Sequence, residues 1–271
     1  MISVLNSVSQ LGAENALSST NASLQNTLLQ LSTGLKINSG SDNATGLSIA
    51  SGLGANISAL TQSSQNASNG VGLLQTADGA LSQVTTLLNR AVTLATEAAN
   101  GGLTAAQSTA ADTEYQSILS EVTQIGSTTN FNGTSVFSAT PQTVFTSDGT
   151  AGGTTTTSTT TGALSATTLG LTGTLTTVAA ATASLTAITD AINTVSGTRG
   201  SIGASVNQLT ADSSVENTEV TNLTSAQNNV QNADIGTTVA KMTQDNVLEQ
   251  TGMAALSQSN QAQQAVLKLL Q

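Results

Sequence analysis

The chain lacks several residue types on which catalysis and metal binding usually depend. Its 271 residues include no cysteine, no histidine, no tryptophan and a single proline. The absence of Cys and His excludes thiol redox chemistry, zinc fingers and nucleophiles activated by histidine. Aromatic residues make up 1% of the chain, which excludes a stacking platform for single-stranded nucleic acid. We therefore expect a protein that is not an enzyme and that holds no metal or cofactor.

Charge is also scarce. Charged residues make up 7% of the chain, whereas about 25% is usual in soluble domains. The net charge of -10 argues against a nucleic acid partner, because its phosphates would be repelled. No apolar stretch reaches the roughly 18 residues that a membrane span needs. Residues 1–10 contain neither the basic nor the apolar region of a Sec-type signal peptide.

What the chain does contain is small aliphatic residues at helical spacing. Near the N-terminus, Leu17, Leu24, Leu28, Leu31 and Leu35 fall on the a and d positions of heptads. Apolar stripes also run through residues 53–98, 111–125, 181–230 and 235–270. The first of these stretches has two adjacent stripes, so we expect that helix to pack against at least two neighbours.

The middle of the chain has a different pattern. Residues 142–146 have strand-like composition, residues 147–149 are turn-like, and residues 154–161 are nearly all Thr, which favours strands. This pattern predicts a β-hairpin, and a disordered O-glycosylated stalk is the alternative. The heptads at the two ends can pair only if the chain folds back. We therefore predict a mainly α fold: an elongated antiparallel helical bundle or coiled coil from the N- and C-terminal segments, with a small β-hairpin near residues 142–161 at its far tip.

Local sequence signals predict where the helices break. Residues 39–42 (SGSD) are expected to stop one helix and to cap the next. The segment 130–133 (NFNG) is a turn signal. Gly46 is interpreted as a tight backbone approach, and Asn69-Gly70, inside a heptad run, as a tolerated helix defect.

Several blocks of the sequence carry a family resemblance. Residues 24–54 read LQNTLLQLSTGLKINSGSDNATGLSIASGLG, similar to the N-terminal block of bacterial flagellins, L..LS(S/T)GL(R/K)INS followed by D(D/N)A(A/T)GL(A/S)I. Further matching blocks, in order, are residues 65–80, 97–101, 130–133, 232–240 and 258–271. The chain thus resembles a bacterial flagellin over roughly residues 1–137 and 180–271. Since almost nothing lies between Leu171 and Ala181, it resembles a short form that lacks the outer variable domains.

This resemblance implies a structural subunit that polymerises into the flagellar filament for motility; a flagellin-like hook–filament junction protein is the alternative. It also implies a terminal coiled-coil domain of residues 1–42 and 232–271 that lines the inner tube. Residues 43–231, including a β-hairpin region at 138–177, would form the outer tube. The implied partners are other copies of the chain, the flagellar type III export apparatus, an export chaperone, and the filament cap and hook-junction proteins. The implied location is extracellular, reached without a Sec signal.

Candidate contact residues follow from the heptads and the resemblance. The residues expected in inter-subunit packing are Leu24, Leu28, Leu31, Leu35, Arg90, Leu94, Leu256, Leu267 and Leu270. Leu88, Arg90 and Leu94 also match the patch that a Toll-like innate receptor contacts in some flagellins. The recognised members carry Arg and Glu where this chain has Val92 and Thr93, so an inter-subunit hydrogen bond or ion pair is the preferred role for Arg90.

Charge placement agrees with a polymer. Residues 1–41 carry only Glu14 and Lys36, and residues 250–271 carry only Lys268. Because burying an unpaired charge costs several kcal/mol, segments that other copies will surround should be nearly uncharged. A cytoplasmic coiled-coil scaffold would instead carry many e and g charges. We also expect residues 1–40 and 232–271, marginal as isolated helices, to be disordered in the exported monomer and helical after polymerisation.

Overall fold

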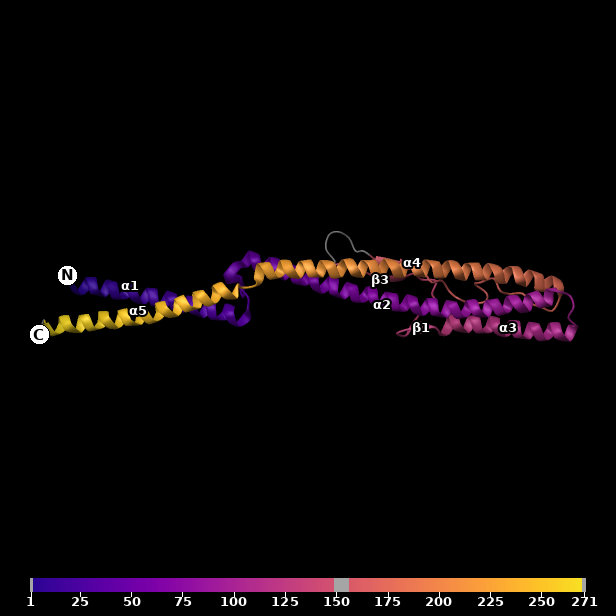
Figure 1. Cartoon of the computed structure of the whole chain (residues 1–271), viewed down its shortest axis with the longest axis horizontal. Coiled ribbons are helices and arrows are strands. Elements are labelled where there is room, and N and C mark those ends of the chain that lie inside the picture. The colour runs from indigo at the N-terminus through magenta and orange to yellow at the C-terminus, as the bar shows by residue number, and fades with distance from the viewer. Residues whose placement is uncertain (1, 149–155, 270–271) are drawn as a thin grey trace. The chain divides into compact units, whose positions relative to one another are not determined.

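The computed structural model describes residues 2–148 and 156–269, and within these ranges most residues are helical (Figure 1). The elements in chain order are α1 (Ile2–Thr33), α2 (Gly40–Ala99), α3 (Ala105–Thr128), β1 (Asn130–Phe131), β2 (Thr134–Ser135), β3 (Gln142–Phe145), β4 (Thr156–Thr159), α4 (Val178–Gln231) and α5 (Ile235–Leu269). The predicted mainly α class is confirmed.

The chain divides into two compact units, which we describe separately. The first, called here the terminal unit, comprises residues 1–55 and 223–271, and the second comprises residues 56–222. The division predicted from the sequence, 1–42 with 232–271 and then 43–231, concerns layers of a polymer and stays a prediction.

In the terminal unit, α1 and α5 pair antiparallel along their length (Figure 1). Near the chain ends, Gln10 Nε2 donates to Asn260 Oδ1 at 3.2 Å. At the other end of the pair, Leu35 forms an antiparallel bridge with Asn232. These contacts join segments at opposite ends of the sequence, so the predicted fold-back of the N- and C-terminal segments is confirmed.

The first helix ends earlier than residues 39–42 predict. It stops at Thr33 because Gly34 takes a left-handed φ of 74° and its N–H bonds to the Gln30 carbonyl at 2.9 Å, which closes the helix C-terminus. Asp42 stabilises the loop that follows. Its Oδ2 accepts the backbone N–H groups of Asn38 and Ser39 at 3.0 and 2.9 Å, and these bonds lower the pKa of the Asp42 carboxyl.

The helix cap itself is Asn43, one residue later than predicted. Asn43 has extended backbone angles (φ -165°, ψ 97°), and its Oδ1 accepts the N–H of Gly46 at 2.9 Å. The interpretation of Gly46 as a tight approach is confirmed, since a Cβ there would lie 2.5 Å from Cδ1 of the buried Ile37. A Gly is needed at this point for the loop to fold over the start of the helix.

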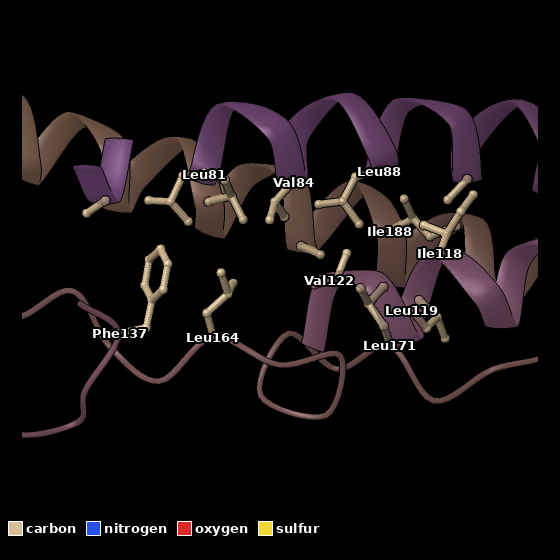
Figure 2. Close-up of a cluster of buried hydrophobic side chains, with 14 of the residues drawn as sticks. Leu81, Val84, Leu88, Ile118, Leu119, Val122, Phe137, Leu164, Leu171 and Ile188 are labelled. Carbon is tan, nitrogen blue, oxygen red and sulfur yellow. The ribbon is translucent and has the colours of Figure 1, made fainter. Parts of the chain in front are cut away.

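In the second unit, α2, α3 and α4 surround a continuous apolar core. Figure 2 shows Leu81, Val84 and Leu88 of α2 facing residues of α3 and Ile188 of α4. Phe137, Leu164 and Leu171 reach the same core from the segments that flank the β-hairpins. The second apolar stripe of this helix is also covered, since Leu73, Ala80 and Leu87 are partly buried against the core. The prediction that this helix packs against at least two neighbours is confirmed.

Two small hairpins complete the second unit. Strands β1 and β2 enclose Asn132 and Gly133, which have φ values of 50° and 78°, the combination that a tight type I′ turn requires. Strands β3 and β4 are antiparallel, with Gln142 opposite Thr159 and Phe145 opposite Thr156. The predicted hairpin is therefore confirmed in place of a disordered stalk for the paired residues. Its predicted turn at Gly149 and residues 154–155 lie outside the described residues.

The β3–β4 hairpin lies along the helices and not at the far tip that the sequence analysis predicted. Its contact with α2 is at Gly70, where a Cβ would lie 2.7 Å from Val144 Cγ2 and 3.1 Å from Leu209 Cδ1. The interpretation of Gly70 as a tolerated helix defect is therefore wrong. The missing side chain leaves the space into which the hairpin and a Leu of α4 pack.

Gly70→Ala is expected to lower the free energy of unfolding. Overpacking costs about 1–3 kcal/mol, whereas the gain in helix propensity is about 1 kcal/mol. Gly79→Ala is the matched control in the same helix, because a Cβ there meets nothing within 4 Å. It should raise stability by about 1 kcal/mol. Urea denaturation followed by circular dichroism measures both, and equal stability of the two variants would contradict the proposed space requirement.

Candidate self-association surface

Large apolar side chains are exposed mainly on the terminal unit. The exposed ones there are Val8, Leu11, Leu28, Leu29, Ile49, Ile235, Val239, Val247, Leu248 and Met253. Among the hydrophobic residues whose burial is described in this unit, Ile37 and Ala50 alone are fully buried. The unit therefore leaves more large apolar side chains on its surface than in its interior, which is typical of a surface that another molecule covers.

The seam between α1 and α5 is partly polar. Asp245 Oδ2 accepts the hydroxyls of Ser23 at 2.9 Å and of Thr27 at 3.4 Å. Thr27 and Asp245 are only 1% and 6% exposed. A buried carboxylate is tolerated only where donors satisfy it, so these bonds fix how the two helices are placed along each other. The sequence analysis did not predict the role of Asp245. Its only signal in the sequence was a charged residue three positions after Met242, within the apolar stripe of residues 235–270.

The predicted leucines of the two terminal helices differ in exposure. Leu28 is 47% exposed, whereas Leu24, Leu31 and Leu35 are half-buried. Leu256 of α5 is also half-buried. The side chain of Leu267 and the whole of Leu270 lie outside what the structure describes. In the described part, Leu28 is thus the predicted leucine that is most available to a second molecule.

The predicted residues of the second unit do not form one surface. Leu88 and Leu94 are 0% and 4% exposed and belong to the core of this chain. Leu94 thus packs within its own chain, and the contact between subunits that the sequence assigned to it stays a prediction. The innate-receptor patch of Leu88, Arg90 and Leu94 likewise stays a prediction. Arg90 is the exposed residue of the three.

Arg90 already has a partner in its own chain. Its Nε and Nη2 donate to Glu114 Oε1 and Oε2 at 2.7 and 3.1 Å, joining α2 to α3. The hydrogen bond from Arg90 lowers the pKa of the Glu114 carboxyl. The other arginine is paired in the same way, since Arg199 donates to Asp78 Oδ1 and Oδ2 at 2.8 and 3.3 Å and joins α4 to α2. Both arginines therefore connect helices within the second unit.

A buried carboxylate lies where the β3–β4 hairpin meets the helices. Glu216 of α4 is 5% exposed, and its Oε1 accepts the hydroxyl of Ser63 of α2. Its other oxygen is buried with no hydrogen-bond partner. Burial raises the pKa of the Glu216 carboxyl, and the neighbouring Asp212 and Glu219 add to this effect. Folding therefore disfavours the ionised form of this carboxyl relative to the unfolded chain.

Glu216→Gln is expected to stabilise the second unit at neutral pH. Because the pKa of Glu216 is raised by folding, its contribution to stability is greatest below the unfolded pKa and is lost as pH rises through the folded pKa. Gln is neutral throughout, so the gain should be about 1 kcal/mol at neutral pH and should vanish near pH 4. Urea denaturation across this range measures the difference.

The matched control is Glu219→Gln, which removes an exposed carboxylate from the same helix. This substitution should change stability by less than about 0.5 kcal/mol. A Glu216→Gln variant that was less stable than the wild type at neutral pH would show that the ionised carboxylate is favoured in the fold.

The described residues offer neither a membrane-spanning helix nor a metal-binding cluster. Within 2–148 and 156–269, no helix combines the length and the hydropathy that crossing a membrane would require. Over the same ranges, His, Cys, Asp and Glu side chains form no group of three suited to a metal ion.

Comparison with known families identifies the chain's relationship. The family model of the bacterial flagellin N-terminal helical region matches residues 4–142, and that of the C-terminal helical region matches residues 185–270. The chain belongs to the bacterial flagellin family. The resemblance found in the sequence is thereby confirmed. The N-terminal region covers α1 from residue 4 onward, and the C-terminal region covers all of α5.

Individual flagellins are similar over about half of the chain. Flagellin of Serratia marcescens is 39% identical over 140 residues, which are 51% of this chain and 40% of that protein. Flagellin 1 of Proteus mirabilis is 36% identical over 125 residues, 46% of this chain and 34% of that protein. The crystal structure of Bacillus cereus flagellin matches at 29% identity with a TM-score of 0.49, covering 56% of this chain and 88% of that one. The matched segments thus span less than half of the length of the two named sequence relatives.

Proposed function

We propose that this chain is a structural subunit that polymerises with its own copies into the flagellar filament used for motility. The observation that carries the proposal is the terminal unit, which keeps ten large apolar residues exposed, nine of them on its two paired helices. Membership of the flagellin family gives this exposed surface its interpretation. In a polymer, neighbouring copies would cover it.

The energetics favour self-association through this unit. Fully burying one Val, Leu or Met side chain is worth about 1.5–3 kcal/mol. Ten residues that are about half exposed therefore offer a driving force of several kcal/mol per subunit, even after the entropy cost of association. Along α1 few charges oppose this burial, because Glu14 is its one charged residue.

The proposal also includes the position of each segment in the filament, the export route and the neighbouring proteins. Residues 1–42 and 232–271 would form the inner tube, and residues 43–231 the outer tube. The subunit would act outside the cell without catalysing a reaction, after passage through the type III export apparatus with its chaperone. The filament cap and the hook-junction proteins would contact the ends of the polymer. A hook–filament junction protein is the alternative function, and it is less favoured because both flagellin family models match.

Electron microscopy of the purified chain tests the proposal. Long hollow filaments are the expected result, and monomers or short caps would contradict it. Circular dichroism before and after assembly should show a gain in helix, because α1 and α5 lack a buried core of their own. If helicity stayed unchanged, the terminal helices would already be folded in the monomer.

A double variant tests the surface itself. Leu28→Gln with Leu29→Gln keeps helix propensity but removes two exposed apolar side chains, worth about 2 kcal/mol of burial per subunit. The soluble concentration in equilibrium with polymer should rise by about tenfold or more, measured by sedimentation. Val215→Gln, on the exposed surface of the second unit, is the control and should have a smaller effect. Equal effects of the two substitutions would contradict the leading role of the terminal unit.

A further inference from the structure

The basic residues of this acidic chain are unequally engaged. It has 5 basic residues for 15 acidic ones. Both arginines form bidentate ion pairs inside the second unit. Among the side chains that the structure describes, Lys36 and Lys241 are the cations without an ion pair, and both are exposed. They are therefore the positive charges available to another molecule.

These two lysines lie together. Lys36 follows α1 and Lys241 is in α5, yet both line one cleft of about 310 Å³ within the terminal unit. The backbone holds Lys36 in place, since its N–H donates to the Gln231 carbonyl at 2.7 Å and its carbonyl accepts Gln30 Nε2 at 3.2 Å. The cleft is therefore a defined feature of the junction where α1 and α5 meet.

The one carboxylate that lines this cleft, Asp234, already accepts hydrogen bonds from the backbone. Asp234 Oδ1 accepts the backbone N–H groups of Gly236 and Thr237 at 2.9 and 3.4 Å, which caps the start of α5. The N-terminus of α5 also contributes partial positive charge. Two lysines against one engaged carboxylate leave the cleft positive, in a chain whose net charge is -10.

The matching negative charge is abundant in the second unit. Residues 56–222 carry 10 acidic and 2 basic residues, and both basic residues are paired. Glu121 of α3 and Asp190 of α4 are exposed and take part in no ion pair of the described chain. Copies with this net charge repel one another, so their association favours contacts that place a cation against these carboxylates.

We propose that the cleft of Lys36 and Lys241 is a subunit contact that binds carboxylates from the second unit of a neighbouring copy. The proposal rests on the polymer function proposed above and adds the occupant of this site. An exposed ion pair adds little affinity by itself. Its effect is to set which surfaces meet, because a misplaced copy would leave like charges opposed.

Chemical cross-linking identifies the occupant directly. A water-soluble carbodiimide joins an amine to a carboxylate only where the two groups are in contact. Filaments assembled from isotopically light and heavy chains should yield mixed light–heavy peptides that join Lys36 or Lys241 to Asp or Glu of residues 56–222. The proposal is overturned if these two lysines form no cross-links, or only cross-links within one chain.

Substitution of the lysines gives a second test. Lys36→Gln with Lys241→Gln should raise the soluble concentration in equilibrium with polymer about threefold or more and should flatten its dependence on sodium chloride. Lys36→Arg with Lys241→Arg keeps both charges and should assemble like the wild type. Wild-type behaviour of the Gln pair would overturn the proposal.

A phosphate series tests the two lysines by competition. If carboxylates of a neighbouring copy occupy the cleft, inorganic phosphate competes for the two lysines and should weaken wild-type assembly more than sodium chloride of equal ionic strength. The Gln pair should lack this excess effect, and equal sensitivity of the wild type and the Gln pair to phosphate would overturn the proposal. Failure of the wild type itself to form filaments would instead contradict the proposed function.

Discussion

When two helices pair, each can bury only one of its sides against the other, and this constraint determines which residues of the terminal unit are exposed. Helices α1 and α5 contact each other along one side, where Thr27 and Asp245 are buried. Their other sides carry apolar residues such as Leu28 and Val247 outward. A stable apolar layer needs a second layer against it. Within this unit the chain offers none for those sides, so their burial depends on other molecules.

The second unit solves the same problem within one chain. The inner face of α2 is covered by α3, α4 and the segments that carry Phe137 and Leu171. Its two arginines form ion pairs between helices, and Val144 of the hairpin packs against α2 at Gly70. The two units thus have similar low-charge, aliphatic sequences but different numbers of layers. The number of layers, more than the composition, explains why the second unit buries its apolar residues and the terminal unit leaves many of them exposed.

Much of this architecture could be predicted from the sequence, because it depends on periodicity. The heptads predicted the helices and their fold-back, and the Thr-rich middle predicted the hairpin. Contacts between distant segments could not be predicted in the same way. Gly70 looks like any Gly inside a helix until Val144 is placed against it. Leu94 and Leu28 both occupy apolar positions, and only the number of neighbouring helices makes the first buried and the second exposed.

The charged contacts show the same limit. Asp245 and Glu216 lie in polar stretches that contain other acidic residues, and nothing in the local sequence distinguishes them from solvated carboxylates. Their burial follows from donors far away in the sequence, Ser23 and Ser63. Lys36 and Lys241 likewise share a cleft only because α1 and α5 are antiparallel.

The buried bond between Ser23 and Asp245 has a consequence for synthesis. These residues are 222 positions apart in the sequence, so the terminal pair cannot form until the last helix of the chain has been made. Contacts of such sequence separation form late, because the intervening chain must be ordered or spanned first. A chain interrupted before α5 would carry α1 without its partner and would present an incomplete seam. The pairing of the two ends therefore requires a chain that includes α5.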